Sequence, residues 1–342
     1  MRIYKNSPNK IVLTITITLL LSFALKAEIN MKDASYRQSF FDIQEVRRTY
    51  NSRSLYTGFF GFGWCSNLEK SLDIKSPKEI SFKECDQEFP FVLTDENNLL
   101  KTRTYENTIT KEKLIFKSGS YTQYLNTGEI RVFNRLGQMI SAIQPHGQRI
   151  GYLYNHQNLI SLKTNSNLLL TFSFNDTRQI TRIQSNSGLS SLYLYEKQNL
   201  VQTVNSTKQS HLYDYDDLNN MVRLTFPDKT EENIVYNKDH DRAVKIQLRN
   251  ECIEYYDYYQ KNNDPLYQIS TLTRKCDNKT IHTFIYEFWY KVRPDGLKYL
   301  ERYKINQSIQ SKKNQTVDIT YNPYDGNPVR ILKDGKDLII KI

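Results

Sequence analysis

The sequence predicts an all-β protein in which consecutive antiparallel hairpins form one curved or spiralling sheet. Two observations lead to this prediction. Aromatic residues recur every 20 or 21 positions, and the strand-favouring residues Tyr and Phe are abundant, with 25 Tyr and 16 Phe in 342 residues. A unit of about 20 residues has room for two short strands and two turns, but not for an added helix.

The N-terminus has the pattern of a secretory signal peptide. Arg2, Lys5 and Lys10 precede an apolar stretch from Ile11 to Leu25, which is 15 residues long. A transmembrane helix needs about 20 apolar residues. We therefore expect residues 1–27 to be a cleaved signal peptide, with an uncleaved N-terminal anchor as the alternative. The mature protein is then exported to the periplasm, cell surface or medium, with no stable membrane span after cleavage.

The charge of the chain does not favour nucleic acid as a partner. The formal net charge is +10, and it falls to +6 without residues 1–27, which contribute four basic and no acidic side chains. No dense basic block remains in the mature chain, whereas nucleic-acid binding domains cluster Lys and Arg on one face.

Four cysteines follow the signal: Cys65, Cys85, Cys252 and Cys276. An even number in an exported chain suggests disulfides. Proximity along the chain favours the pairs Cys65–Cys85 and Cys252–Cys276 among the three possible connectivities. A zinc site is disfavoured because no C-x-x-C pair occurs and no His stands at ligand spacing. Free buried thiols are the other interpretation.

Six aromatic residues anchor the repeat, and most have another aromatic residue two positions earlier, on the same face of a strand. The repeat anchors are Phe133, Tyr154, Phe174, Tyr195, Tyr215 and Tyr236. Seven positions before five of them stand Gly147, Asn167, Gly188, Lys208 and Lys229. Gly and Asn enter left-handed backbone at low cost, so each unit is predicted to run turn, strand, polar turn, strand.

Three stretches resemble the Rhs/YD-repeat family. Y-D-Y-D at 213–216 is similar to its repeat unit. R-R-T-Y-N-S-R-S at 47–54 and G-F-F-G-F-G-W at 58–64 are similar to the entry of Rhs repeat regions. After the signal peptide at 1–27, the resemblance implies an entry-like β region at 28–125 and a repeat sheet at 126–342 that is looser after residue 250.

Members of this family are typically large exported proteins whose repeats coil into a β-sheet shell, often around a C-terminal toxin. This sequence departs from that plan. It has only about eight units, Lys208 and Lys229 stand where Gly is expected, and no distinct C-terminal effector follows the repeats. We therefore expect a short member without a C-terminal toxin.

One further stretch bears on self-cleavage. R-P-D-G-L at 293–297 resembles the motif that ends many Rhs cores, near which some members cleave themselves. Arg293 replaces the leading Asp of that motif, so a simple β-turn between two strands is expected here, without self-cleavage.

The sequence predicts no catalytic, cofactor or metal site. The five histidines have no partner at helix-ligand spacing. The acidic cluster at 214–220 lacks the Gly and distal Glu of a calcium loop, and suits a hairpin turn. Gly58, Gly61 and Gly63 are in the wrong order for a phosphate-binding loop, so we expect a tight turn or bulge that caps the sheet.

These observations predict an exported, non-enzymatic structural or interaction protein of the Rhs/YD-repeat type. It would present a β-sheet surface to an envelope protein, a glycan or another extracellular partner. One alternative is a truncated component of a toxin shell. The other is a hydrolase that acts on envelope polymers through carboxylates assembled by the fold. A concave pocket with two buried carboxylates, or with a His–carboxylate pair, would favour the hydrolase.

The first prediction concerns export. Mass spectrometry of the exported protein should find a mature N-terminus at Leu25 or Glu28. Ser22 and Ala24 place small residues at both recognition positions before Leu25, whereas the first recognition position before Glu28 holds the poorly suited Leu25. Intact Met1 as the main species in the soluble cytoplasmic fraction would contradict this.

Overall fold

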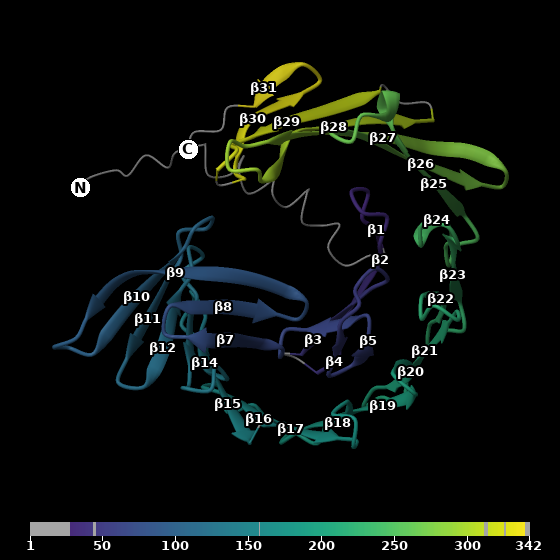
Figure 1. Cartoon of the computed structure of the whole chain (residues 1–342). Coiled ribbons are helices and arrows are strands. Elements are labelled where there is room, and N and C mark those ends of the chain that lie inside the picture. The colour runs from purple at the N-terminus through teal and green to yellow at the C-terminus, as the bar shows by residue number, and fades with distance from the viewer. Residues whose placement is uncertain (1–27, 44–45, 157, 311–313, 325, 339–342) are drawn as a thin grey trace, which may run out of the picture.

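The large sheet of the protein curves into an open arc, and an N-terminal segment lies inside that arc (Figure 1). The computed structural model describes residues 28–43, 46–156, 158–310, 314–324 and 326–338. The expected signal peptide at 1–27 lies outside the described residues. We call residues 28–69 the inner segment. Within the described part of the chain, the only helix is the 3-10 turn η1 (Lys261–Asn263).

The large sheet has 25 strands that pair antiparallel with their chain neighbours, and its first and last strands are not paired with each other. This confirms the predicted all-β sheet of consecutive hairpins. The first ten strands are β7 (Lys70–Ser76), β8 (Glu79–Glu84), β9 (Gln87–Asn97), β10 (Thr102–Asn107), β11 (Lys113–Lys117), β12 (Ser120–Tyr124), β13 (Ile130–Phe133), β14 (Met139–Ile143), β15 (Arg149–Asn155) and β16 (Asn158–Thr164). The regular units continue through β17 (Leu169–Phe174), β18 (Ile180–Ser185), β19 (Ser190–Glu196), β20 (Asn199–Val204), β21 (Ser210–Tyr215), β22 (Met221–Thr225), β23 (Glu231–Asn237) and β24 (Arg242–Gln247). The last strands are β25 (Ile253–Gln260), β26 (Tyr267–Cys276), β27 (Lys279–Val292), β28 (Lys298–Ile309), β29 (Gln315–Tyr321), β30 (Pro328–Lys333) and β31 (Lys336–Leu338).

The inner segment forms a small sheet of its own. Its strands pair in the order β1 (Glu28–Ile29), β2 (Tyr36–Phe41), β3 (Arg47–Asn51) and β6 (Trp64–Ser66), and a separate hairpin joins β4 (Thr57–Gly58) to β5 (Gly61–Phe62). The structure thus changes from the inner segment to the large sheet at about residue 70. The boundary expected at residue 125 falls inside the large sheet, between β12 and β13.

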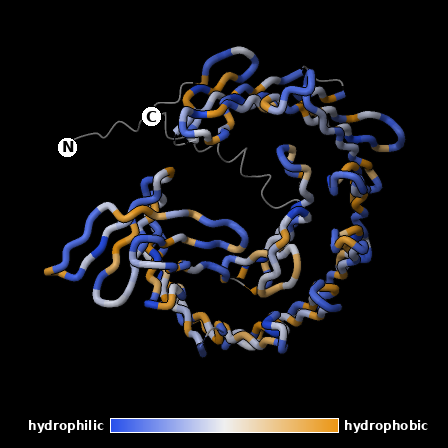
Figure 2. Tube along the Cα trace, viewed as in Figure 1, coloured by the Kyte–Doolittle hydropathy of each residue, from blue (hydrophilic) through white to orange (hydrophobic). Residues whose placement is uncertain are grey.

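Hydrophobic and hydrophilic residues alternate along the strands (Figure 2), and the buried residues of the regular units form the core on the concave side. On β19, Tyr193 is 3% exposed, whereas its neighbours Leu192 and Leu194 on the opposite face are 44% and 47% exposed. Successive side chains on a strand point to opposite faces, so one face of every hairpin lines the inside of the arc.

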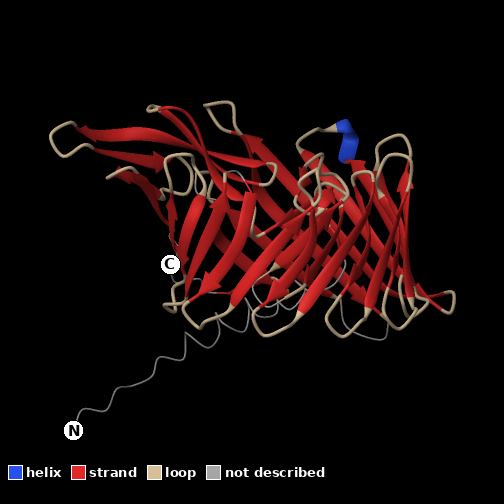
Figure 3. Cartoon of the chain, turned by 90° about the horizontal axis from the view of Figure 1, so that it is seen from below, coloured by secondary structure: helices blue, strands red, loops and turns tan. Residues whose placement is uncertain are grey.

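A β-bulge precedes each of the repeat anchors. The pairing register shifts between Leu194 and Tyr195, and between Asp214 and Tyr215, and equivalent shifts occur before Phe133, Tyr154, Phe174 and Tyr236. A bulge increases local twist and bends its strand. One bulge per unit therefore gives the sheet a regular curvature, and the tilted strands are seen from the side in Figure 3.

Tyrosine hydroxyls connect consecutive units. Tyr195 Oη donates to the Ile180 carbonyl at 2.6 Å, and Tyr215 Oη donates to the Leu200 carbonyl at 2.9 Å. Tyr236 and Tyr258 make the same bond to Met221 and Ala243, again 15 residues earlier. These four tyrosines, three repeat anchors and Tyr258, are half-buried, and we call this series the tyrosine ladder. It explains why the anchor position favours Tyr over Phe, since the hydroxyl satisfies a buried carbonyl of the preceding unit.

The turns use left-handed backbone where the sequence predicted it. Gly147 and Gly188 have φ of 88° and 86°, and Lys208 and Lys229 take φ of 61° and 70° at equivalent positions. A non-glycine residue costs roughly 1–2 kcal/mol in this conformation. The two lysines therefore keep the geometry of the repeat at a local cost in stability.

The first strands of the sheet curl onto themselves. The Leu72 amide in β7 donates to the Gly137 carbonyl at 2.8 Å, and Ser71 bridges Gln138. Gly137 has φ of 79°, and a Cβ there would lie 2.0 Å from the Leu72 oxygen. This curl encloses a second hydrophobic core that includes Phe82, Tyr105 and Phe133.

The second prediction tests the tyrosine ladder. Tyr195→Phe should lower the free energy of unfolding by about 1–2 kcal/mol, because the buried Ile180 carbonyl loses its donor. Tyr195→Ala should cost about 3–5 kcal/mol, as for other large aromatic truncations. Urea unfolding measures both, and Tyr124→Phe at a 45% exposed position is the control. A Tyr195→Phe protein as stable as that control would contradict the ladder.

Candidate functional site: the inner segment on the concave face

The inner segment packs against the concave face of the large sheet over β17 to β27. Its side chains Tyr36, Tyr50, Phe60 and Trp64 are at most 1% exposed and share one core with the sheet. The chain thus builds a second layer against its own repeats, which a single sheet with an apolar face requires.

The inner segment contacts equivalent backbone groups in three of the units. The amides of Ile180, Met221 and Ala243 lie at the start of the strand that follows an anchor and its turn. They donate to the Phe59 carbonyl at 2.7 Å, to Tyr50 Oη at 2.9 Å and to the Ala34 carbonyl at 3.1 Å, respectively. The carbonyls of the same residues accept the hydroxyls of the tyrosine ladder. These three units are therefore bonded both to the next unit and to the inner segment.

Gly61 allows the closest backbone approach between the two layers. It has φ of 95°, and a Cβ at this position would lie 2.3 Å from the Gln198 oxygen. The next amide, of Phe62, donates to that same oxygen at 2.8 Å. The glycine-rich stretch is thus a turn docked against the sheet, which is the tight turn that its sequence predicted.

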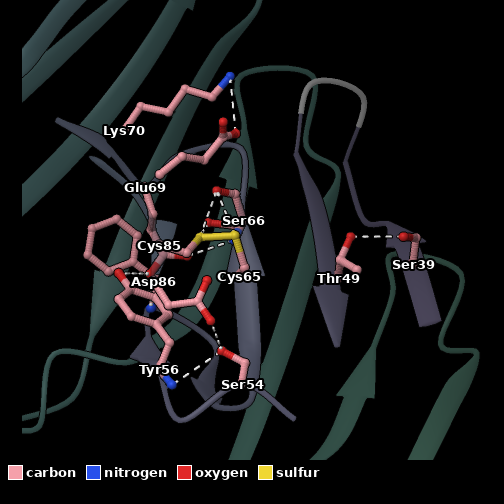
Figure 4. Close-up of a disulfide and its surroundings, with 12 residues drawn as sticks. Ser39, Thr49, Ser54, Tyr56, Cys65, Ser66, Glu69, Lys70, Cys85 and Asp86 are labelled. Atoms are coloured by element: carbon pink, nitrogen blue, oxygen red, sulfur yellow. Dashed lines mark hydrogen bonds and ion pairs between the residues drawn. A yellow bond between two sulfur atoms is a disulfide. The ribbon is translucent and has the colours of Figure 1, made fainter. Parts of the chain in front are cut away.

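Glu69 holds the glycine-rich turn from within, and sequence inspection did not single it out. Its carboxylate accepts the Phe59 amide at 2.6 Å, the Ser66 amide at 2.8 Å and Tyr56 Oη at 3.1 Å. Burial raises the pKa of Glu69, and these donors oppose that shift. The surroundings are drawn in Figure 4.

Arg48 is a buried cation at the centre of the interface. It is 1% exposed, and its Nε lies 3.0 Å from Asp42 Oδ2. Its Nη2 donates to Tyr213 Oη at 2.9 Å. The guanidinium also lies 4.4 Å from the ring centre of Phe40 and 4.5 Å from that of Trp64. Planar stacking with a charged partner is the arrangement that arginine provides and lysine does not.

Two disulfides are present. Cys65–Cys85 joins β6 of the inner segment to the turn between β8 and β9, as Figure 4 shows, and Cys252–Cys276 joins the start of β25 to the end of β26. These are the two local pairings that proximity favoured. The first fastens the inner segment to the large sheet, beside the bond from Ser54 Oγ to Asp86 Oδ2 at 2.7 Å.

Two buried carboxylates lie on the concave face, as the hydrolase alternative requires. Glu232 is 8% exposed and Glu254 is 5% exposed. Burial raises the pKa of Glu232, which accepts Tyr36 Oη at 3.4 Å, while Glu254 accepts Arg274 Nε at 2.7 Å. Neither residue lines the hollows at β28–β30 or at β27–β29. The side chain of Tyr36, from the inner segment, lies against Glu232.

A hollow of about 380 Å³ lies on the outer face instead, between β28, β29 and β30. Its carboxylates are those of Glu301 and Asp318. Glu301 forms an ion pair with Lys291, and Asp318 is held by Arg302 at 2.9 Å. The bond from Arg302 lowers the pKa of Asp318, which opposes a role as general acid.

The remaining candidate residues lie in turns or among aromatic rings. Asp216 Oδ1 accepts the Leu218 and Asn220 amides at 2.9 Å and 2.8 Å, as in a hairpin turn. The stretch at 293–297 forms the turn between β27 and β28, with the Gly296 amide bonded to the Arg293 carbonyl at 2.9 Å. His211 packs edge-on against Phe40 and Phe226.

The described residues hold no group of three or more His, Cys, Asp or Glu side chains arranged for a metal ion. Over the same residues, no helix is both long enough and apolar enough to cross a membrane.

The fold and the inner segment define a class: a β-repeat protein whose hairpin units curve around an N-terminal segment. A family model described as a domain of unknown function, DUF6531, matches residues 43–111, from just before β3 to the turn between β10 and β11. That range includes the arginine-containing motif at 47–54 and the glycine-rich motif at 58–64, both in the inner segment. No curated protein sequence matches the chain.

Several solved structures of toxin complexes match at low similarity. The crystal structure of TcdB2-TccC3-TEV has 10% identity and a TM-score of 0.31, over 94% of this chain and 24% of that one. The Photorhabdus luminescens Tc holotoxin pore with a TccC3 mutation has 10% identity and a TM-score of 0.24, over 90% and 23%. TcdB2-TccC3 without its hypervariable C-terminal region has 10% identity and a TM-score of 0.26, over 87% and 22%. The chain therefore spans about a quarter of the length of these solved chains.

The third prediction concerns the buried ion pair. Arg48→Met should lower the free energy of unfolding by about 3–5 kcal/mol, because it leaves the Asp42 carboxylate buried without its partner. The double variant Asp42→Asn with Arg48→Met should recover part of that loss. Urea unfolding of the oxidised protein measures both. A loss below about 1 kcal/mol for Arg48→Met would show that this ion pair contributes little to the stability of the fold.

The fourth prediction concerns pH. Burial, helped by the nearby Arg48 charge, lowers the pKa of His211 to about 4. An unfolded histidine has a pKa of about 6.5, so below that pH the unfolded chain binds the proton more readily. The stabilising contribution of neutral His211 is therefore full above pH 6.5 and is lost as the pH falls toward 4.

The matched variant for this prediction is His211→Phe, which keeps an aromatic ring between Phe40 and Phe226. The wild type should lose more stability than the variant between pH 6.5 and pH 4, as followed by thermal unfolding. The ring protons of His211 should titrate near pH 4 in an NMR experiment. A titration near pH 6.5, with parallel stability curves, would show that the imidazole is not desolvated.

Proposed function

We propose that this chain is an exported, non-enzymatic interaction protein of the Rhs/YD-repeat type. In this proposal the inner segment and the two disulfides make the curved sheet rigid, and the outer strand faces contact a partner in the envelope or outside the cell. The proposal includes a relationship to toxin shells, but only for the curved repeat sheet.

The observation that carries the proposal is the occupation of the concave face by the chain itself. Tyr36, Tyr50 and Trp64 pack into the core on that face, and the Tyr36 hydroxyl donates to the buried carboxylate of Glu232 at 3.4 Å. A hydrolase would need this pair of carboxylates open to substrate, and a shell would need the concave face free for cargo. The mixed outer face is left to meet a partner, with exposed Leu192, Leu194 and Leu212 among charged residues.

The experiment that tests the proposal is a pull-down of the mature protein from envelope extracts. Bound proteins are identified by mass spectrometry, and bound glycans by sugar analysis. The matched control is the Tyr195→Ala variant, which should have a weakened sheet but the same surface composition. Specific capture by the wild type, reduced for the control, supports the proposal. Cleavage of any envelope polymer by the purified wild type would overturn its non-enzymatic part.

A further inference from the structure

Three hairpin turns lie at the same end of the first strands of the large sheet. They join β9 to β10, β11 to β12 and β13 to β14. A row of register partners crosses β10 to β13 just before these turns, and its members are Arg103, Phe116, Tyr121 and Phe133. Alternate turns of an antiparallel sheet fall at one edge, and Figure 1 shows β9 to β11 reaching outward from the arc. We call residues 97–101, 117–120 and 134–138 the leucine rim.

The leucine rim exposes three large apolar side chains. Leu99 and Leu100 are 92% and 66% exposed, and Leu136 is 77% exposed. The turns fix their backbone, since Asn97 Oδ1 accepts the Leu100 amide and Asn134 Oδ1 accepts the Leu136 amide, each at 2.9 Å. Single exposed leucines scattered over a surface are ordinary, whereas a group of them on neighbouring turns marks a contact surface.

The charged side chains of the leucine rim are all basic and exposed: Lys101, Lys117 and Arg135. The sequence places no Asp or Glu in the rim. Glu96, the acid that directly precedes it, pairs with Arg103 at 2.6 Å. Arg135 also connects two of the turns, since a Cβ on Gly119 would lie 2.7 Å from its Nε. The rim therefore combines exposed leucines with positive charge and contains no acid of its own.

An equivalent turn in a later repeat unit has the opposite charge. Leu218, between β21 and β22, stands at the place of Leu136, and it is 61% exposed with its amide bonded to Asp216 Oδ1 at 2.9 Å. Asp217 stands there at the place of Arg135. The repeat thus places a leucine on such turns without requiring a basic neighbour. The pairing of leucine with basic charge is a feature of the rim and not of the repeat.

An anionic bilayer surface fits this combination. The boundary between headgroups and acyl chains accepts apolar side chains, and anionic headgroups attract Lys and Arg. The other side chains of the rim are those of Asn, Ser and Gln, which bond polar headgroups. A protein partner would have to offer an apolar pocket and an acid to each of three turns, whereas a bilayer offers both over any area.

We propose that the leucine rim binds peripherally to an anionic lipid bilayer, with its three leucines inserted among the headgroups. This inference goes beyond the proposed function, because it adds a lipid contact at the turns of the sheet. The partner of the proposed function meets the outer strand faces instead. Since the rim lies at the ends of strands, a bilayer bound there leaves those faces free.

The experiment is vesicle co-sedimentation of the mature, oxidised chain, which lacks the apolar stretch 11–25. One set of vesicles contains phosphatidylcholine with phosphatidylglycerol, and the other contains phosphatidylcholine alone. The leucine variant is Leu99→Ser with Leu100→Ser, and the lysine variant is Lys101→Gln with Lys117→Gln. A matched pair, Leu136→Ser and Leu218→Ser, compares equivalent turns inside and outside the rim. Circular dichroism and urea unfolding check that each variant is folded.

The wild type should bind the mixed vesicles, and the leucine variant should bind them about tenfold more weakly, because two apolar side chains no longer leave water. The lysine variant should lose the preference for mixed vesicles. Leu136→Ser should weaken binding, whereas Leu218→Ser should not. No binding by the wild type, or equal binding by the leucine variant, overturns the inference.

A protein partner at the rim gives a different result. If the wild type ignores vesicles but captures an envelope protein that the leucine variant loses, the rim recognises polypeptide and the inference fails. The outer strand faces are unchanged in every rim variant. Failure of the proposed function is therefore seen separately, as a wild type that captures no partner from envelope extracts.

Discussion

The structure depends on covering the concave face of the repeat sheet. Hairpins of about 20 residues bury one face only against another layer, and neighbouring units supply edges but no such layer. The inner segment supplies that layer. In doing so it buries the Arg48 charge in the core, which costs free energy. Asp42, Tyr213 and the rings of Phe40 and Trp64 compensate for the lost hydration of that charge. The buried cation also fixes the position of the inner segment, since its partners come from both layers.

Curvature and coverage are coupled through the same residues. The bulges before the anchors bend each unit, and the amides that follow the next turn then point at the inner segment. Ile180 and Met221 illustrate this, since each gives its amide to the inner segment and its carbonyl to an anchor tyrosine. A flatter sheet would carry these amides away from Phe59 and Tyr50. The curvature of the sheet and the packing of the inner segment therefore depend on each other.

The sequence alone was enough to predict the sheet, because its aromatic and turn residues recur periodically. Anchors such as Tyr195 and turn residues such as Gly188 recur at a fixed spacing, and each unit repeats the same local physics. The interface was only partly predictable. Gly61 and Trp64 belong to a recognisable stretch. In contrast, the partners of Arg48 include Tyr213, 165 positions away, and no feature of the sequence near Arg48 indicates that contact. Tyr195 and Tyr215 are only half-buried, whereas Tyr193 and Tyr213, two positions earlier, are 3% and 1% exposed, which the repeat spacing did not indicate.

Glu69 was missed for a different reason. A single carboxylate carries no pattern, and its role follows only from the turn that surrounds it. Beyond residue 250 the strands lengthen and the 20-residue spacing ends, so no periodic signal fixes the register of β28 against β29. Sequence periodicity therefore predicts the regular units but not the pairing of the last strands.

The tyrosine ladder couples the stability of neighbouring units. Each hydroxyl reaches back to the preceding unit, so the Met221 carbonyl is satisfied only while the unit of Tyr236 is folded. Opening that unit also removes the Ala243 carbonyl, which accepts the hydroxyl of Tyr258. Opening one unit therefore breaks a hydrogen bond to the unit before it and another to the unit after it. The units that the ladder joins would then unfold together, and those that the inner segment also holds would open last.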